Sequence, residues 1–160
     1  METYDEAALE HMRRVNVNGV INTIRAAMTG MTARGYGRII NIASNAAIGT
    51  ALPGTTFYAA TKAEVLILTK RFALELGRDG ITVNAVCPGW IVTDMTRGTA
   101  TEEAFLERVA GMRERTMVGR VGAPDDIAAA VAFLACPEAG FTTAQVLTVD
   151  GGRKDYIGHG

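Results

Sequence analysis

The sequence is short of the residues on which several classes of protein depend. Its two cysteines, Cys87 and Cys136, form no Cys-x-x-Cys pattern, and its two histidines, His11 and His159, stand far apart. This argues against a disulfide framework and against a zinc site. Sixteen basic residues oppose seventeen acidic ones, so the formal net charge is only −1. We therefore expect reduced thiols, no metal, and no nucleic acid or membrane as a partner.

Long apolar runs are missing too. The longest one, Ile127–Cys136, is well below the roughly 18 residues that a membrane-spanning helix needs. The segment Met1–Glu6 is acidic and polar, whereas a signal peptide would be basic and then apolar. These two features predict a cytoplasmic protein.

The composition favours one class of fold. Of the 160 residues, 48% are hydrophobic, which is enough to bury a core within one domain. Eighteen glycines and an aromatic content of 6% suit an α/β protein with tight turns better than an all-β sandwich. We expect a single domain over residues 1–160, without internal repeats or linkers.

Compact β-branched runs alternate with longer stretches that have helical spacing. Strands separated by helices in this rhythm favour a parallel sheet with helices on its faces. The predicted elements are a helix over Thr3–Arg34, a strand over Arg38–Ala43, a loop over Ser44–Thr55, a helix over Thr56–Arg78, a strand over Ile81–Val86, helices over Thr101–Arg115 and Pro124–Ala135, and a strand over Gln145–Val149.

Capping patterns indicate where two of these helices begin. Thr3 and Glu6 stand three residues apart, as do Thr99 and Glu102, and both pairs match a capping box. Pro124 suits a first helical turn. These patterns predict helix starts at all three places.

Tyr58 and Lys62 are four residues apart on a predicted helix, so a phenol and an ammonium share one face. A free phenol has a pKa near 10, which suits proton transfer at neutral pH poorly. A cation within a few ångströms favours the phenolate, and at an effective dielectric of about 20 the pair is worth several kcal/mol. The pattern predicts an acid/base tyrosine; taken alone, it also fits an ordinary half-exposed helix face.

Ser44 ends the first predicted strand, at the edge where open α/β sheets place their ligands. A hydroxyl at this position can donate a hydrogen bond to a substrate carbonyl while Tyr58 supplies the proton. The alternative is a serine that begins a loop and caps backbone groups.

These residues and their order resemble the short-chain dehydrogenase/reductase family over almost the whole chain. Tyr58 and Lys62 match its Tyr-x-x-x-Lys signature, and Asn16 matches its helix asparagine, with Asn18 as the weaker candidate. The remaining similar stretches are the strand that ends in the catalytic serine (Gly37–Ser44), the segment with the Pro-Gly turn (Ile81–Thr93), Gly119–Pro124 and Val149–Gly152.

The resemblance implies a Rossmann-like α/β fold and a role for each catalytic residue. Tyr58 would exchange a proton with the substrate oxygen, and Ser44 would orient and polarise that oxygen. Lys62 would lower the Tyr58 pKa and bind the nicotinamide ribose. Asn16 would hold a water that connects Lys62 to solvent; its alternative role is a buried amide that braces a helix.

The resemblance also implies a cofactor, a substrate class and an assembly. Pro88, Gly89, Ile91 and Thr93 would line the nicotinamide of NAD or NADP, a choice that this sequence leaves open; a turn alone would also explain Pro88-Gly89. The substrate would be a small carbonyl compound or secondary alcohol beneath a mobile lid over residues 97–115. A homodimer or homotetramer would be the assembly. The family usually has Thr-Gly where this chain has Thr143-Ala144.

The sequence departs from the family pattern at its front. The family begins with a strand and a Gly-x-x-x-Gly-x-Gly turn that binds the pyrophosphate, and this chain contains neither that pattern nor an Asn-Asn-Ala-Gly strand end. We expect the chain to represent the C-terminal part of the fold. It is then the ordered or sequenced part of a longer protein, a half that needs a complementing chain, or a truncated product; the first is favoured because a two-faced apolar strand is unsuited to a bare edge.

Three functions stay open at this point. The leading one is hydride transfer between a nicotinamide cofactor and a carbonyl or secondary alcohol. The second is a non-catalytic fragment that acts only as an association module, since the helices and last strand that build the family's oligomers are present. The third, epimerisation or dehydration with the same Tyr–Lys pair, ranks low because little chain follows the Tyr58 helix.

Overall fold

Three parallel strands form the centre of the molecule in the computed structural model, which describes residues 5–157. They are β1 (Gly37–Ile42), β2 (Ile81–Pro88) and β3 (Val146–Val149), and they lie in the order β1-β2-β3. All pairing within the sheet is parallel. The predicted parallel α/β architecture is therefore confirmed.

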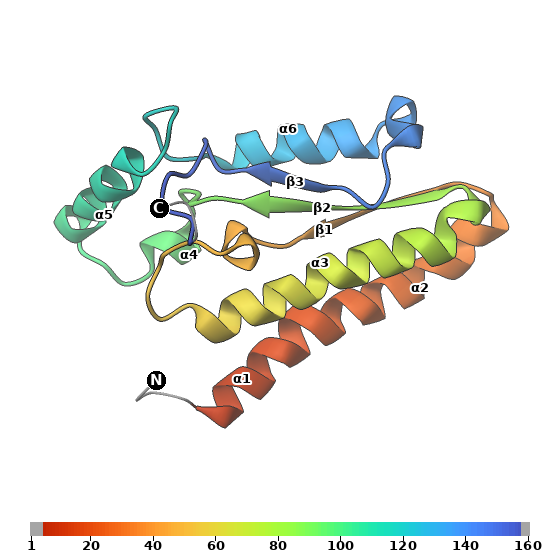
Figure 1. Cartoon of the computed structure of the whole chain (residues 1–160), viewed down its shortest axis with the longest axis horizontal. Coiled ribbons are helices and arrows are strands. Elements are labelled where there is room, and N and C mark those ends of the chain that lie inside the picture. The colour runs from red at the N-terminus through yellow and green to blue at the C-terminus, as the bar shows by residue number, and fades with distance from the viewer. Residues whose placement is uncertain (1–4, 158–160) are drawn as a thin grey trace.

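Helices cover both faces of this sheet (Figure 1). α2 and α3 lie on one face and α6 lies on the other, while α5 stands beyond the carboxyl ends of the strands. Among the described residues, no helix combines the length and apolar character needed to cross a bilayer. The helices are α1 (Glu6–Arg13), α2 (Gly19–Ala33), α3 (Thr56–Leu76), α4 (Asp94–Arg97), α5 (Glu102–Glu114) and α6 (Pro124–Ala135).

β2 is buried along nearly its whole length because both of its faces are covered. Apolar residues predominate in it, as expected for a central parallel strand, and the polar Thr82 and Asn84 are buried with them. The polar Asn84 is tolerated there because its amide donates to the Thr142 carbonyl at 2.8 Å and its oxygen accepts from the Gln145 N–H at 3.0 Å. The side chain thus fixes the approach to β3.

The first helix is not continuous, in contrast to the single helix predicted over Thr3–Arg34. Asp5 caps α1 by accepting from the Ala7 N–H at 2.9 Å, while the Thr3 half of the predicted capping box lies outside the described residues. A π-helical turn over Arg14–Asn18 separates α1 from α2, and in it the Gly19 N–H reaches back five residues to the Arg14 carbonyl. The apolar spacing of the sequence does not reveal this turn.

Other boundaries differ from the predictions because of local capping. Thr101, and not Thr99, caps α5: its hydroxyl accepts from the Ala104 N–H at 3.3 Å. The unpredicted helix α4 is capped by Thr93, whose hydroxyl accepts from the Thr96 N–H. β2 continues through Pro88, which lies opposite Val149 in the register. The strand is therefore two residues longer than predicted, and Pro88 belongs to it.

Candidate active site

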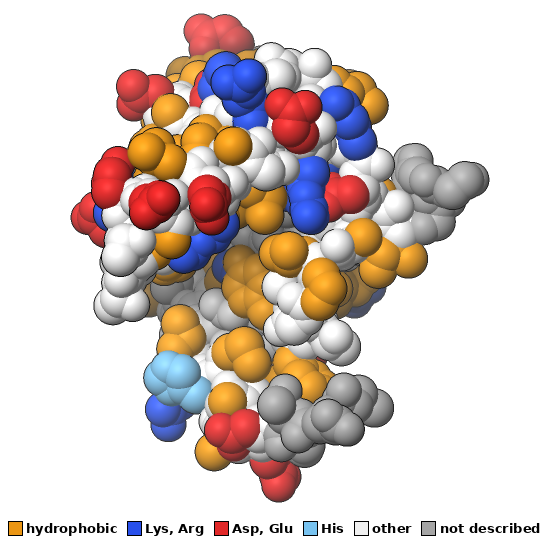
Figure 2. All heavy atoms as spheres, turned by 90° about the vertical axis from the view of Figure 1, so that its left-hand side faces the viewer, with side chains coloured by type: hydrophobic (Ala, Val, Ile, Leu, Met, Phe, Trp, Pro, Cys, Tyr) orange, Lys and Arg blue, Asp and Glu red, His pale blue; other side chains and the backbone are white. Residues whose placement is uncertain are grey.

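A cleft of about 680 Å³ opens at the carboxyl ends of β1 and β2. Figure 2 views the molecule from that side, where hydrophobic side chains line a hollow between the upper and lower parts of the surface. The cleft brings together seven of the eight predicted site residues, from the π-helical turn Arg14–Asn18, α3, β2 and the connections that follow β1 and β2. These seven are Asn16, Ser44, Tyr58, Lys62, Pro88, Ile91 and Thr93.

Lys62 lines this cleft. Its Nζ donates to the Ile42 carbonyl, the last of β1, at 3.0 Å. The same Nζ lies 5.9 Å from the centroid of the Tyr58 ring. Burial lowers the pKa of Lys62 from its ordinary value of 10.5, and the neighbouring Cys87 opposes this shift.

Tyr58 stands in the first turn of α3 with 36% of its surface exposed. The spacing of four residues along the helix sets it on the same side as Lys62. Its ring is therefore not enclosed in packing, and it lines the same cleft as Ser44 and Lys62. This arrangement is the one that an acid/base tyrosine needs.

Ser44 follows β1 and begins a 3-10 turn, Asn45–Ile48, inside the stretch predicted as a loop. Its Oγ accepts from the Ala46 N–H at 3.2 Å. The capping alternative is thus observed, and Ser44 also lines the cleft, so its predicted contact with a substrate carbonyl stays a prediction. As an acceptor in the cap, the hydroxyl can still donate its own hydrogen.

Asn16 lies in the π-helical turn, a type of irregularity that often occurs at functional sites. Its amide donates to the Thr61 hydroxyl at 3.0 Å, and that hydroxyl donates to the Tyr58 carbonyl at 2.9 Å. Thr61 precedes Lys62 and is fully buried. The structure thus joins Asn16 to the Tyr-x-x-x-Lys helix through a residue to which the sequence assigned no role.

The Pro-Gly turn is held against the end of β3. The Gly89 N–H donates to the Val149 carbonyl at 2.9 Å, and Ile91 forms an isolated parallel bridge with Gly122. Pro88, Ile91 and Thr93 line the cleft, whereas Gly89 lies behind it against Asp150. The predicted cofactor segment therefore shares the cleft with Ser44, Tyr58 and Lys62, with the exception of Gly89.

A family model described as Enoyl-(Acyl carrier protein) reductase matches residues 1–154. This match covers almost the whole chain. The chain belongs to the short-chain dehydrogenase/reductase family.

Individual members of the family are similar at about 40% identity. The short-chain reductase protein NovJ of Streptomyces niveus is 41% identical over 147 residues, which cover 87% of this chain and 53% of the relative. The 3-oxoacyl-[acyl-carrier-protein] reductase FabG of Haemophilus influenzae is 42% identical over 153 residues, covering 95% of this chain and 60% of the relative. The chain thus spans between one half and two thirds of the length of these curated relatives.

A solved structure gives the same fold. The gluconate 5-dehydrogenase of Burkholderia cenocepacia, crystallised with NADP and tartrate, superimposes with a TM-score of 0.84 at 36% sequence identity. The match covers 94% of this chain and 57% of the dehydrogenase. The Rossmann-like fold of this short-chain dehydrogenase/reductase family member is therefore established over nearly all of its residues.

Some residues that line the cleft could not be predicted from the sequence. Met95 and Thr96 enter from α4, and Ile127 and Val131 enter from α6. Apolar residues at helical spacing in α6 are indistinguishable in sequence from those that face a core. The only available signal was the Pro124 helix start, which the family resemblance placed near the C-terminal end.

The cleft in this family member suits a nicotinamide ring with its ribose. Its volume falls in the range of about 300–1,000 Å³ that small-molecule sites occupy. A lysine ammonium, a phenol and the hydroxyl groups of one serine and two threonines supply the donors that ribose and carboxamide oxygens require. Within residues 5–157, no three His, Cys, Asp or Glu side chains gather as a metal site would.

Proposed function

We propose that these residues belong to an NAD(P)-dependent oxidoreductase that moves hydride between a nicotinamide cofactor and a carbonyl or secondary alcohol. One observation carries the proposal: the Lys62 ammonium lies 5.9 Å from the Tyr58 ring in a cleft that Ser44 also lines. A phenol, a cation and a hydroxyl around one opening are the groups needed to bind, polarise and protonate a carbonyl oxygen.

Tyr58 acts as the acid/base group in this proposal. In reduction, its hydroxyl gives a proton to the carbonyl oxygen, and in oxidation its phenolate takes the proton of the alcohol. The Lys62 cation stabilises the phenolate electrostatically, because partial burial weakens the screening by water between the two groups. Ser44 donates a hydrogen bond to the substrate oxygen and fixes its position relative to Tyr58.

The cofactor is NAD or NADP, and when bound it supplies or accepts the hydride. Lys62 would hold the hydroxyl groups of the nicotinamide ribose, because its ammonium has donors beyond the one given to the Ile42 carbonyl. Pro88, Ile91 and Thr93 would line the nicotinamide ring. The Gly-x-x-x-Gly-x-Gly pyrophosphate turn of the family is not among these 160 residues.

Asn16 would connect the catalytic lysine with solvent through a bound water. The amide already donates to Thr61, next to Lys62, so its carbonyl oxygen remains suited to accept from a water. The wider π-helical turn favours this role, since it alters the backbone hydrogen bonding around Asn16.

The substrate would be a modest carbonyl compound or alcohol. Apolar side chains such as Met95, Ile127 and Val131 border the cleft, while the polar groups gather around Tyr58. The relatives bear the names of reductases and dehydrogenases for different substrates, including 3-oxoacyl-[acyl-carrier-protein] and gluconate. We propose that this protein likewise interconverts a carbonyl group and a secondary alcohol. We also propose that it is cytoplasmic and that it forms a homo-oligomer.

The decisive experiment replaces Tyr58 with phenylalanine in the complete enzyme. The ring is retained and only the hydroxyl is lost, so kcat should fall by about 10²- to 10⁴-fold while the Kd of the cofactor stays nearly constant. Tyr36→Phe is the matched control, because Tyr36 is a half-exposed residue before β1 and outside the cleft. Turnover retained in Tyr58→Phe would refute the assignment.

An association module is the second candidate, and exposed apolar helix faces favour it. Ile67 and Leu74 on α3 are 58% and 69% exposed, and Phe133 on α6 is exposed as well. Calorimetric titration of the 160-residue chain with NAD and with NADP separates the two functions. Dissociation constants weaker than roughly 1 mM for both cofactors would support the module for this chain alone.

A further inference from the structure

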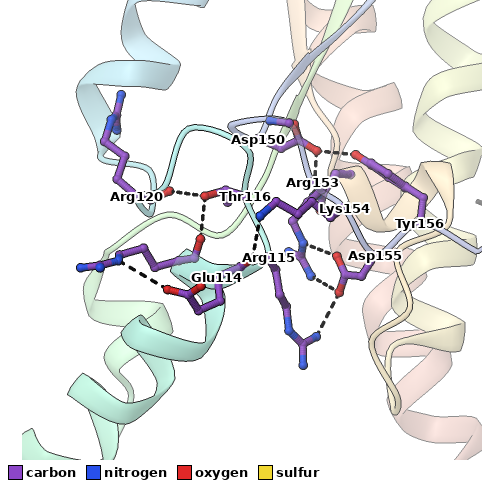
Figure 3. Close-up of polar contacts among 12 residues, drawn as sticks. Glu114, Arg115, Thr116, Arg120, Asp150, Arg153, Lys154, Asp155 and Tyr156 are labelled. Carbon is purple, nitrogen blue, oxygen red and sulfur yellow. Dashed lines mark hydrogen bonds and ion pairs between the residues drawn. The ribbon is translucent and has the colours of Figure 1, made fainter.

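Asp150 stands at the end of β3, where three separate segments meet. Its Oδ2 accepts a hydrogen bond from the Tyr156 hydroxyl and one from the Asn45 amide at 3.4 Å. Its Oδ1 accepts from the Gly152 N–H at 3.0 Å. Figure 3 shows Tyr156 pointing at this carboxylate from the C-terminal segment.

The Asn45 contact leads directly to Ser44. Asn45 is buried and begins the 3-10 turn that Ser44 caps. The Ser44 carbonyl accepts from the Ala47 N–H at 3.1 Å while its Oγ accepts from the Ala46 N–H. A shift of Asn45 would therefore rotate the turn that sets the direction of the Ser44 hydroxyl.

Asp150 also contacts the Pro-Gly turn, behind the cleft and next to Pro88, which would line the nicotinamide. A Cβ added to Gly89 would lie 2.6 Å from the Asp150 Cβ and 2.7 Å from its Cα. The Gly89 N–H donates to the carbonyl of Val149, the residue before Asp150. The turn after Pro88 thus rests on Asp150 without space for any side chain between them.

The segment that carries Tyr156 is itself fixed to the molecule. The Asp155 carbonyl accepts from Ala51 N–H and the Gly49 carbonyl accepts from Ile157 N–H, both at 2.7 Å. The Asp155 carboxylate is bonded to the buried Arg153, as Figure 3 shows. Burial and the hydrogen bond to Asp150 raise the pKa of Tyr156, so its hydroxyl remains a donor.

We propose that Asp150 is a positioning residue for the cleft. It holds the turn of Ser44 in place by its hydrogen bond with Asn45, and it holds the Pro-Gly turn by its contact with Gly89. Tyr156 helps to hold the Asp150 carboxylate in place, because its hydroxyl donates to the same oxygen as the Asn45 amide. The catalytic consequence rests on the proposed oxidoreductase function. The positioning of the Ser44 turn is independent of that function, because it follows from the contacts alone.

The first experiment measures hydrogen exchange, which needs no activity. Tyr156→Phe removes one hydroxyl, so exchange in a peptide over residues 44–49 should rise by about three- to tenfold, while a peptide from α6 should not change. Tyr36→Phe serves as the control and should leave both peptides unchanged. Unaltered protection of residues 44–49 in Tyr156→Phe would overturn the proposal.

The second experiment is a double-mutant cycle on turnover in the complete enzyme. Asn45→Ala should lower kcat about tenfold with the cofactor Kd constant, and in a Ser44→Ala background the same change should add little, because Asn45 acts through Ser44. Equal losses in both backgrounds would overturn the link to Ser44. Each rate is measured well below the Tm of the variant.

A third comparison addresses Asp150 itself. Asp150→Asn keeps an oxygen that can accept from Asn45 or Tyr156 and should retain most of kcat, whereas Asp150→Ala should lose it. Equal turnover in these two variants would count against the proposal. If Asp150→Ala does not fold, Asn45→Ala and Tyr156→Phe decide. Retained turnover in Tyr58→Phe refutes only the proposed function, since the exchange experiment still tests the positioning.

Discussion

At the scale of single residues, Lys62 illustrates a conflict between stability and the proposed chemistry. Its ammonium is partly buried and donates a hydrogen bond to the Ile42 carbonyl. Burial lowers the pKa of Lys62, which means that the folded state disfavours the charge. Such a residue is tolerated where a function requires its charge.

Lys62→Met tests this conflict, since methionine keeps the length and loses the charge. We expect kcat to fall by more than about 100-fold while stability rises by roughly 1 kcal/mol, or about 2–4 °C in Tm for a domain of this size. With its pKa lowered, Lys62 binds fewer protons in the folded state than in the unfolded chain, so stability should increase as pH rises toward 10.5. Thermal melts across pH 7–10 should show this slope in the wild type and a flatter one in Lys62→Met. A lower Tm in the variant would contradict the argument.

Some site residues can be recognised from local spacing in the sequence, and others can be recognised only from the structure. Tyr58 and Lys62 share one helix, and Ser44 ends a strand, so spacing alone could suggest them. Asn45 and Asp150 are 105 positions apart and meet only because β3 returns beside β2. A contact of this kind depends on the register of the sheet, which no local pattern encodes.

At the scale of elements, the predicted strands and the three later helices were confirmed, whereas the predicted N-terminal helix is interrupted and several element ends were wrong. Apolar runs extend over whole elements, so their existence is well determined by hydrophobic burial. A cap depends on one hydroxyl and its backbone geometry, and Thr99 and Thr101 are both suitable in sequence. The structure uses Thr101 because its extended backbone directs the hydroxyl at the Ala104 N–H.

Two glycines at the end of α3 provide the element-scale prediction. Gly80 has φ +74°, and a Cβ there would lie 2.2 Å from the Gly35 carbonyl oxygen, a backbone atom. Gly80→Ala should therefore cost about 2 kcal/mol or more by strain and overlap. Gly77 has φ −60° with nothing within 4 Å of an added Cβ, so Gly77→Ala should be neutral or stabilise by up to about 1 kcal/mol. Urea unfolding of both variants measures the difference; equal midpoints would contradict it.

At the scale of the whole molecule, the described sheet has an edge with an apolar surface. β1 pairs only with β2 among residues 5–157, and a groove of about 580 Å³ runs along β1 and α2. Apolar side chains of Ile24, Ile39 and Ile40 line it. An edge with unpaired backbone groups and apolar neighbours attracts other chains.

The 160-residue polypeptide, prepared by itself, should therefore self-associate through this edge. Ile40→Lys places a charge in the groove and should therefore weaken self-association. We expect the association constant measured by sedimentation to fall at least about twofold. Ile67→Lys, on the exposed outer side of α3, tests association through the helices instead. Dissociation by Ile67→Lys together with no effect of Ile40→Lys would assign the contact to the helices.

The π-helical turn over Arg14–Asn18 also has a consequence for comparing this helix with others. Each α-helical residue advances by about 100° around the axis, so one additional residue changes the angular phase of everything upstream. Arg13, which pairs with Glu64 of α3 at 3.1 Å, thus belongs to a different phase from Ile24, which enters the core. A helical wheel for this region has to restart at Gly19, and a one-residue deletion within the turn would rotate α1 away from α3.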